Sequence, residues 1–83
     1  MKTIIYTAAA ARDLDALPRD VRSGIENALD LYATSGRGDV KALQGQGGYR
    51  LRVGRYRVVF DEDRTTVLAV YIGKRETTTY RRN

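Results

Sequence analysis

The sequence predicts an α+β domain of the order β-α-α-β-β-β, in which a helical hairpin covers one face of a mainly antiparallel sheet. Three observations predict it: a β-branched segment near the N-terminus, two consecutive segments with helical spacing of apolar residues, and three strand-like segments toward the C-terminus. Helices grouped together and strands grouped together favour separate layers over alternating β-α units. With 83 residues the chain has the length of one domain, which we place at 1–83.

The N-terminal half predicts a short strand and two helices. Residues 2–6 are rich in β-branched and aromatic side chains, which favours a strand. Thr7 can cap a first helix over about 8–16, because its hydroxyl can accept from a free backbone N–H of the first turn. Pro18 suits the first turn of a second helix. The apolar residues of that helix share one face and predict a core-facing stripe: Val21, Ile25, Ala28, Leu29 and Tyr32.

The C-terminal half predicts three strands. A glycine-containing segment, 35–38, ends the second helix, and residues 44–48 form a flexible approach to the first of these strands. A charged turn, 61–64, separates the last two strands. The three predicted strands span 49–53, 56–60 and 66–72. The last is apolar on both faces, as expected of a strand inside the sheet.

The first two of these strands form a hairpin whose loop determines the register. Only Gly54 and Arg55 separate Val53 from Tyr56, and glycine at the first position fits a two-residue type II′ loop. Side chains alternate between the two faces of a strand. One face therefore carries the apolar and aromatic residues Tyr49, Leu51, Val53, Tyr56, Val58 and Phe60. The other face carries Arg50, Arg52, Arg57 and Val59.

Arg52 and Arg57 lie directly opposite each other in this register. Like charges in that position destabilise a sheet by roughly 0.2–1 kcal/mol. A bound phosphate would relieve the repulsion, since arginine pairs with phosphate through two parallel hydrogen bonds. The pattern favours a site for a polyanion. Solvated arginines on an exposed face are the alternative, and a shift of one residue in the loop would move the two side chains apart.

Composition excludes several classes of function. The chain has no cysteine and no histidine, so it lacks disulfide and thiol chemistry as well as the commonest general base and metal ligand. No apolar run approaches the roughly 18–20 residues of a membrane span, and we expect a cytoplasmic protein without a membrane partner. The whole net charge of +5 falls in residues 49–83, which hold nine basic and four acidic side chains. This indicates nucleic acid as a partner, with a solubilising basic surface as the alternative.

The last predicted strand runs into further basic residues. Gly73 is followed by Lys74 and Arg75, and Tyr80 and Arg81 come shortly after. Arg75 could join the arginines of the hairpin. Tyr80 could reach them if the tail folds back, and a frayed C-terminus is the alternative.

Residues 48–60, the segment 70–75 and the pair Tyr80-Arg81 resemble the RelE/ParE toxin superfamily of type II toxin–antitoxin systems. Residues 43–48 are also similar to the Leu-x-Gly approach to the first hairpin strand of that family. The resemblance extends over the whole chain, although in the helices it is only architectural. It implies the microbial-RNase-like fold of the family, which agrees with the element order above.

The resemblance to the RelE-like branch implies a ribosome-dependent mRNA interferase, an endoribonuclease that inhibits translation without a metal or another cofactor. In that branch the ribose 2′-OH attacks the neighbouring phosphate. The positions that match catalytic residues are Arg57, Arg75 and Tyr80. The implied RNA- and phosphate-binding residues are Arg50, Arg52, Lys74 and Arg81. Because histidine is absent, Tyr80 is the candidate for proton transfer among the matched positions, and nearby arginines would favour its ionised form.

Two departures from the family pattern keep a second function open. Arg50 and Arg52 form an Arg-Arg pair where active RNases of the family often carry lysine, and the spacing from Gly73 to Tyr80 is not fixed in the family. The ParE-like branch shares the fold and inhibits DNA gyrase without catalysis. A nucleic-acid-binding domain without toxicity is a third reading. Either toxin implies a cognate antitoxin protein as partner, together with mRNA and the ribosome for the RNase or DNA gyrase for the alternative.

Overall fold

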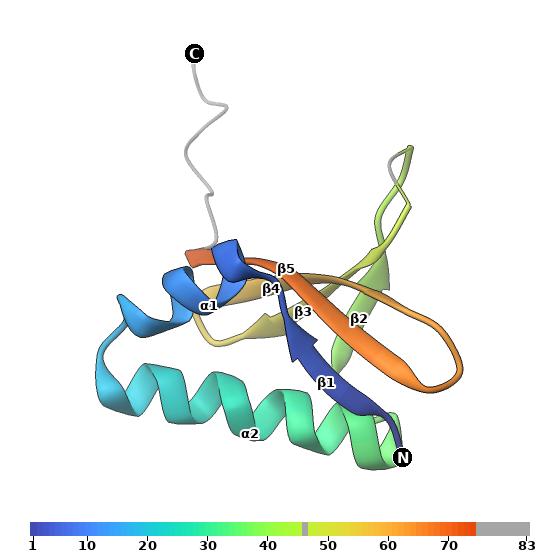
Figure 1. The fold of residues 1–83 in the computed structure, drawn as a ribbon, viewed down its shortest axis with the longest axis horizontal. Coiled ribbons are helices and arrows are strands. Elements are labelled where there is room, and N and C mark those ends of the chain that lie inside the picture. The colour runs from blue at the N-terminus through green and yellow to red at the C-terminus, as the bar shows by residue number, and fades with distance from the viewer. Residues whose placement is uncertain (46, 75–83) are drawn as a thin grey trace.

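The computed structural model describes residues 1–45 and 47–74. Its elements in chain order are β1 (Thr3–Tyr6), α1 (Ala8–Asp15), α2 (Arg19–Ser35), β2 (Asp39–Ala42), β3 (Tyr49–Val53), β4 (Tyr56–Glu62) and β5 (Thr66–Lys74). The strands form one sheet in the order β1-β5-β4-β3-β2 (Figure 1). β1 runs parallel to β5, and every other pair of neighbours is antiparallel. This confirms the predicted α+β class with a mainly antiparallel sheet.

The predicted order β-α-α-β-β-β is wrong in one respect, because it has no strand between α2 and β3. The structure places β2 there, paired antiparallel with β3 from Asp39 opposite Arg52 to Ala42 opposite Tyr49. Three of the four residues of β2 are exposed. So short and polar a segment has little strand signal of its own. It is a strand because β3 would otherwise leave unpaired backbone groups at the edge of the sheet.

Both helices begin and end close to where the sequence predicts. The Thr7 hydroxyl accepts a hydrogen bond from the backbone N–H of Ala10 at 3.1 Å, which confirms Thr7 as the cap of α1. Pro18 directly precedes α2. That helix ends at Gly36, whose left-handed conformation (φ +77°) allows its N–H to bond the Tyr32 carbonyl.

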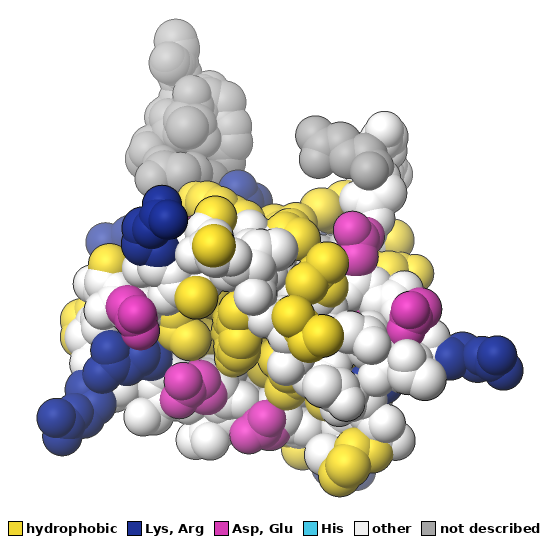
Figure 2. All heavy atoms as spheres, in the orientation of Figure 1, with side chains coloured by type: hydrophobic (Ala, Val, Ile, Leu, Met, Phe, Trp, Pro, Cys, Tyr) yellow, Lys and Arg dark blue, Asp and Glu magenta, His cyan; other side chains and the backbone are white. Residues whose placement is uncertain are grey.

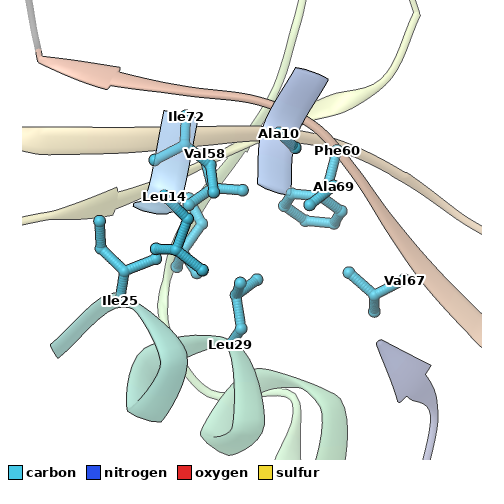
Figure 3. Close-up of a cluster of buried hydrophobic side chains, with 10 residues drawn as sticks. Ala10, Leu14, Ile25, Leu29, Val58, Phe60, Val67, Ala69 and Ile72 are labelled. Atoms are coloured by element: carbon cyan, nitrogen blue, oxygen red, sulfur yellow. The ribbon is translucent and has the colours of Figure 1, made fainter. Parts of the chain in front are cut away.

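The core lies between the two helices and one face of the sheet. Figure 3 shows Leu14 of α1 and Ile25 and Leu29 of α2 directed toward side chains of β4 and β5. The fully buried residues of those strands include Val58, Phe60, Val67 and Ala69. Val21, Ala28 and Tyr32 pack against the same cluster. The predicted stripe of α2 is therefore the core-facing side of the helix, and the predicted apolar face of the hairpin lies against it.

Hydrogen bonds at Thr7, the cap of α1, and at Asp13 hold this helix against the C-terminal part of β5. β1 ends with Tyr6 opposite Ala69, so within the described part of the chain no strand pairs with the rest of β5 on that side. The N–H of Thr7 bonds the Ala69 carbonyl at 2.9 Å. Further along β5, the Asp13 carboxylate accepts from the N–H of Ile72 at 3.2 Å. These contacts fix the end of β5 beside the hairpin.

A polar cluster ties the N-terminus and α2 to β4. Lys2 Nζ and Tyr32 Oη each lie 2.7 Å from a carboxylate oxygen of Glu62. Partial burial raises the pKa of Glu62, but the hydrogen bonds from Lys2 and Tyr32 outweigh it, and the pKa falls below its usual value. Burial and the bond to Glu62 raise the pKa of Tyr32 to about 12. The ionised form of Glu62 therefore stabilises the folded state through these two hydrogen bonds.

Charges of both signs are spread over the side of the molecule drawn in Figure 2. Among the described residues seen there, basic and acidic side chains are interspersed around hydrophobic ones and do not merge into one basic surface. This agrees with the zero net charge of residues 1–48. Within 1–45 and 47–74, no helix is long and apolar enough to cross a membrane.

Candidate nucleic-acid interface

The β3–β4 hairpin has the predicted register at every pair. Val53 lies opposite Tyr56, Arg52 opposite Arg57, and Tyr49 opposite Phe60. Gly54 has φ +58°, and none of the described non-glycine residues has a positive φ. Only the first loop residue is left-handed, as a type II′ loop requires. The loop and the alternation of side chains together confirm that the arginines share one face.

That face points away from the helices. We call it the arginine face, and in the hairpin it carries Arg50, Arg52, Arg57 and Val59. β2 adds two side chains to it, because Asp39 lies opposite Arg52 and Lys41 opposite Arg50. A row across the sheet thus reads Asp39, Arg52, Arg57, Gly73, and the next reads Lys41, Arg50, Val59, Tyr71.

Among residues 1–45 and 47–74, three guanidinium donors on this face find no hydrogen-bond acceptor. The Nε atoms of Arg50, Arg52 and Arg57 are all buried against the sheet and unsatisfied. Arg52 Nε lies 3.3 Å from Asp39 Oδ2, which is close enough for an ion pair but lacks the geometry of a hydrogen bond. Buried donors without an acceptor cost free energy, so a face that groups several of them favours contact with an anion. Three arginine forks on one face suit phosphate oxygens.

A bulge in β5 adds an aromatic side chain to the arginine face. Phe60 pairs with Ala69 and Val59 with Tyr71, which leaves Val70 without a partner in β4. The extra residue reverses the alternation, so that Ile72 is buried while Tyr71 is 44% exposed beside Val59. Sequence reasoning missed Tyr71, because a strand that is apolar on both faces gives no signal of a bulge.

The remaining predicted site residues are not brought to this face by the described part of the chain. Lys74 lies opposite Tyr56, so alternation places it on the face that carries the helices. Arg75, Tyr80 and Arg81 lie outside the described residues. Asp39, Lys41 and Tyr71 are the neighbours of the arginines that the sequence did not indicate, and the pairing of β2 with β3 is the signal that identifies the first two.

Two shallow hollows have linings that do not include Arg50, Arg52 or Arg57. One, of about 260 Å³, is lined mainly by Asp61, Glu62 and Asp63 at the β4–β5 turn. The other, of about 350 Å³, lies between the start of α2 and the tip of the hairpin, where Val21 and Tyr56 contribute to its lining. No group of three His, Cys, Asp or Glu that could hold a metal ion occurs among the described residues.

Chemically, the arginine face can bind and stabilise negative charge. A guanidinium group offers several N–H donors and no acceptor, so these side chains serve as hydrogen-bond donors and not as bases. Donors held in place by the sheet can stabilise charge that develops on a reacting phosphate. Proton transfer needs another group, and Tyr80, the residue that the family resemblance implies for this role, lies outside the described residues.

Comparison with known proteins agrees with this fold. The family model of the ParE toxin of the type II toxin–antitoxin system parDE matches residues 4–78. The isolated RelE toxin of E. coli has a similar structure, with a TM-score of 0.78, 20% sequence identity, and coverage of 95% of this chain and 89% of RelE. No curated protein matches the sequence.

Two further solved structures have the same fold. The RelBE2 toxin–antitoxin complex of Mycobacterium tuberculosis matches with a TM-score of 0.73 and 28% identity over 89% of this chain and 98% of that one. The YoeB dimer of Staphylococcus aureus matches with a TM-score of 0.72 and 17% identity over 92% and 98%. Since the family model spans almost the whole chain and the fold agrees with it, the chain belongs to the ParE toxin family and is a type II toxin of the RelE/ParE superfamily.

Proposed function

We propose that this toxin is a ribosome-dependent mRNA interferase, an endoribonuclease that inhibits translation. The observation that carries the proposal is the grouping of Arg50, Arg52 and Arg57 on one face of the β3–β4 hairpin, where their Nε donors have no acceptor among the described residues. A phosphodiester supplies the acceptors that these donors lack. The RelE-like branch, which the sequence resembles, uses basic residues at these positions for RNA cleavage.

The proposed reaction is attack of the ribose 2′-oxygen on the adjacent phosphorus. The O2′–P bond forms and the P–O5′ bond breaks, which leaves a cyclic phosphate on one fragment and a 5′-hydroxyl on the other. A base takes the proton of the 2′-OH, and an acid protonates the leaving 5′-oxygen. In this scheme Arg57 stabilises the charge on the phosphate in the transition state, while Arg50 and Arg52 hold the RNA backbone.

The family positions outside the described residues complete the scheme as proposals. Arg75 would assist the leaving oxygen, Tyr80 would transfer the proton, and Arg81 would bind the RNA backbone. The strand position of Lys74 is on the helix side of the sheet. It would therefore contact only RNA that extends past the edge of the arginine face. The proposed reaction includes no cofactor.

The test compares three substrates with one protein preparation. The purified toxin is incubated with mRNA on ribosomes, with the same mRNA free in solution, and with DNA gyrase and plasmid. The proposal expects cuts in the ribosome-bound mRNA, largely intact free mRNA and normal supercoiling. Intact mRNA on ribosomes together with inhibited supercoiling would contradict it.

Inhibition of DNA gyrase is the second candidate, and one observation favours it: the family model that matches residues 4–78 describes ParE toxins. The ion pair between Arg52 and Asp39 also lowers the positive charge available for RNA. In this reading the arginine face contacts protein or the DNA held by gyrase, and no bond in a nucleic acid is broken.

A cognate antitoxin is the further proposed partner. Complexes with RelB antitoxins are known for RelE of Methanococcus jannaschii and of E. coli, whose folds this chain shares. The whole net charge of the present toxin lies in residues 49–83. An acidic antitoxin segment would therefore be attracted to the half of the molecule that contains the arginine face.

A further inference from the structure

Tyr71 is an exposed aromatic residue next to the arginines, and a bulge in β5 is what exposes it. Without the bulge at Val70, alternation would direct Tyr71 toward the helices and Ile72 toward solvent. With the bulge, Ile72 is 3% exposed and Tyr71 is 44% exposed. Bulges commonly redirect a side chain beside a functional site.

The ring of Tyr71 lies across Gly73. A Cβ atom at position 73 would lie 2.6 Å from Tyr71 Cζ and closer still to the hydroxyl oxygen. Gly73 does not have a positive φ, so its backbone would accept another residue. It is the ring of Tyr71 that takes the space of a side chain at this position.

This location brings the ring next to the opposed arginines. Gly73 lies directly opposite Arg57, which lies opposite Arg52. Neighbouring strands are about 4.8 Å apart, so the phenol end of the ring is one strand spacing from the backbone of Arg57. The Arg57 guanidinium group, whose geometry suits phosphate, and a partly exposed aromatic ring thus lie on neighbouring strands, within the reach of a single nucleotide.

We propose that Tyr71 stacks on a base of the bound RNA while Arg52 and Arg57 hold the phosphate of the same or the adjacent nucleotide. The inference rests on the proposed function for its substrate, single-stranded mRNA. Bases of single strands are free to stack on aromatic side chains, and such stacking tolerates different bases because each has a π-face. The ring carries this role, and the hydroxyl group is not required for it.

Binding to ribosomes tests the inference separately from cleavage. The probe is a ribosome loaded with mRNA whose exposed codon carries 2′-O-methyl groups, which block attack by the 2′-oxygen. The equilibrium binding of labelled toxin is measured with the intact codon and with each base of the codon removed in turn. Losing one stacked base costs about 10- to 100-fold in affinity. For the wild type, one of the abasic positions should show that loss.

The variants decide which group is responsible. Tyr71→Ala should bind the intact codon about 10- to 100-fold more weakly and lose nothing further at that abasic position. Tyr71→Phe should behave like the wild type, because it retains the ring. Leu31→Ala, which removes a 50% exposed side chain from α2, is the matched control and should change nothing. If Tyr71→Ala does not fold, Tyr71→Leu keeps the apolar bulk and lacks the π-face.

The outcomes separate the two proposals. An equal abasic effect in the wild type and in Tyr71→Ala would overturn the stacking role, and so would a Tyr71→Phe variant as weak as Tyr71→Ala. Cleavage of unmodified mRNA by the wild type would leave the proposed function standing in either case. An abasic effect that is present in the wild type and absent in Tyr71→Ala, without any cleavage of unmodified mRNA, would support the stacking role and contradict the proposed RNase activity. A wild type that does not bind these ribosomes would overturn both.

Discussion

Arg57 occupies the centre of the arginine face. It lies opposite Arg52 on one side and Gly73 on the other, and no described residue supplies an acceptor for its Nε. We expect Arg57→Ala to lower the rate of mRNA cleavage by about 10²–10³, the usual cost of losing one preorganised donor. Single-turnover cleavage on ribosomes measures the effect.

Arg55→Ala is the matched control for this variant. Arg55 is an exposed residue of the loop in the same hairpin and is not part of the arginine face. Its loss should leave the cleavage rate within a few-fold of wild type. Both variants should fold, because neither side chain contributes to the core. Full cleavage by Arg57→Ala at equal concentration would show that the site lies elsewhere.

The proton-transfer role proposed for Tyr80 rests on family resemblance alone. Tyr80→Phe keeps the ring and removes the hydroxyl, so binding to ribosomes should persist while cleavage falls by about 10²–10⁴. The comparison with Tyr71→Phe is informative, since that variant should cleave at the wild-type rate. If the two variants exchanged these results, the proton would pass through Tyr71 and the assignment of Tyr80 would fail.

At the scale of elements, β2 adjusts the charge of the hairpin. Its Asp39 lies 3.3 Å from Arg52 Nε, and both side chains are partly exposed. Surface pairs of this kind contribute about 0–1 kcal/mol, so Asp39→Asn should change stability little. The variant should bind RNA a few-fold more tightly, because Arg52 no longer has a competing carboxylate.

Asp15→Asn provides the control for the change in net charge. Asp15 is exposed at the end of α1, so this variant gains the same charge without touching the arginine face. Binding to programmed ribosomes at two salt concentrations compares the two variants. Weaker binding by Asp39→Asn alone would mean that Asp39 positions Arg52 for RNA and does not compete with it.

The hairpin was the most predictable element, and the strands beside it were the least. A two-residue loop with glycine first, together with alternating side chains, determines every pair from Val53–Tyr56 to Tyr49–Phe60. β2 has no comparable pattern, because its pairing comes from the free edge of β3. The bulge at Val70 was equally hidden, since Val67 to Ile72 are apolar on both faces and either register satisfies the sequence. Asp39 and Tyr71 were missed for these two reasons.

At the scale of the whole molecule, the cluster of Lys2, Tyr32 and Glu62 connects the N-terminus, α2 and β4. The pKa of Glu62 is lowered in the folded state. Its contribution to stability is therefore complete above the ordinary value of 4.5 and is lost as the pH falls through the lower, folded-state pKa. Acid should weaken the fold partly through this cluster.

Glu62→Gln tests this pH dependence. At pH 7 the variant should lower the free energy of unfolding by about 1–3 kcal/mol, the value of hydrogen bonds to a charged group. The difference from wild type should shrink as the pH falls below 4.5, because the wild-type carboxylate also becomes neutral. Asp61→Asn, at the exposed neighbouring position, serves as control in the same denaturant titrations. A difference that stays constant with pH would contradict the role of the ionised carboxylate.

The central claim is that the arginine face of this toxin cuts mRNA on the ribosome. The most direct measurement is synthesis of the toxin without antitoxin in a translation extract, with the 5′-ends of the mRNA mapped and gyrase supercoiling assayed in parallel. The account predicts new 5′-ends within translated codons, their disappearance with Arg57→Ala, and unchanged supercoiling. Intact mRNA with inhibited supercoiling would contradict it and assign the toxin to the gyrase-inhibiting branch.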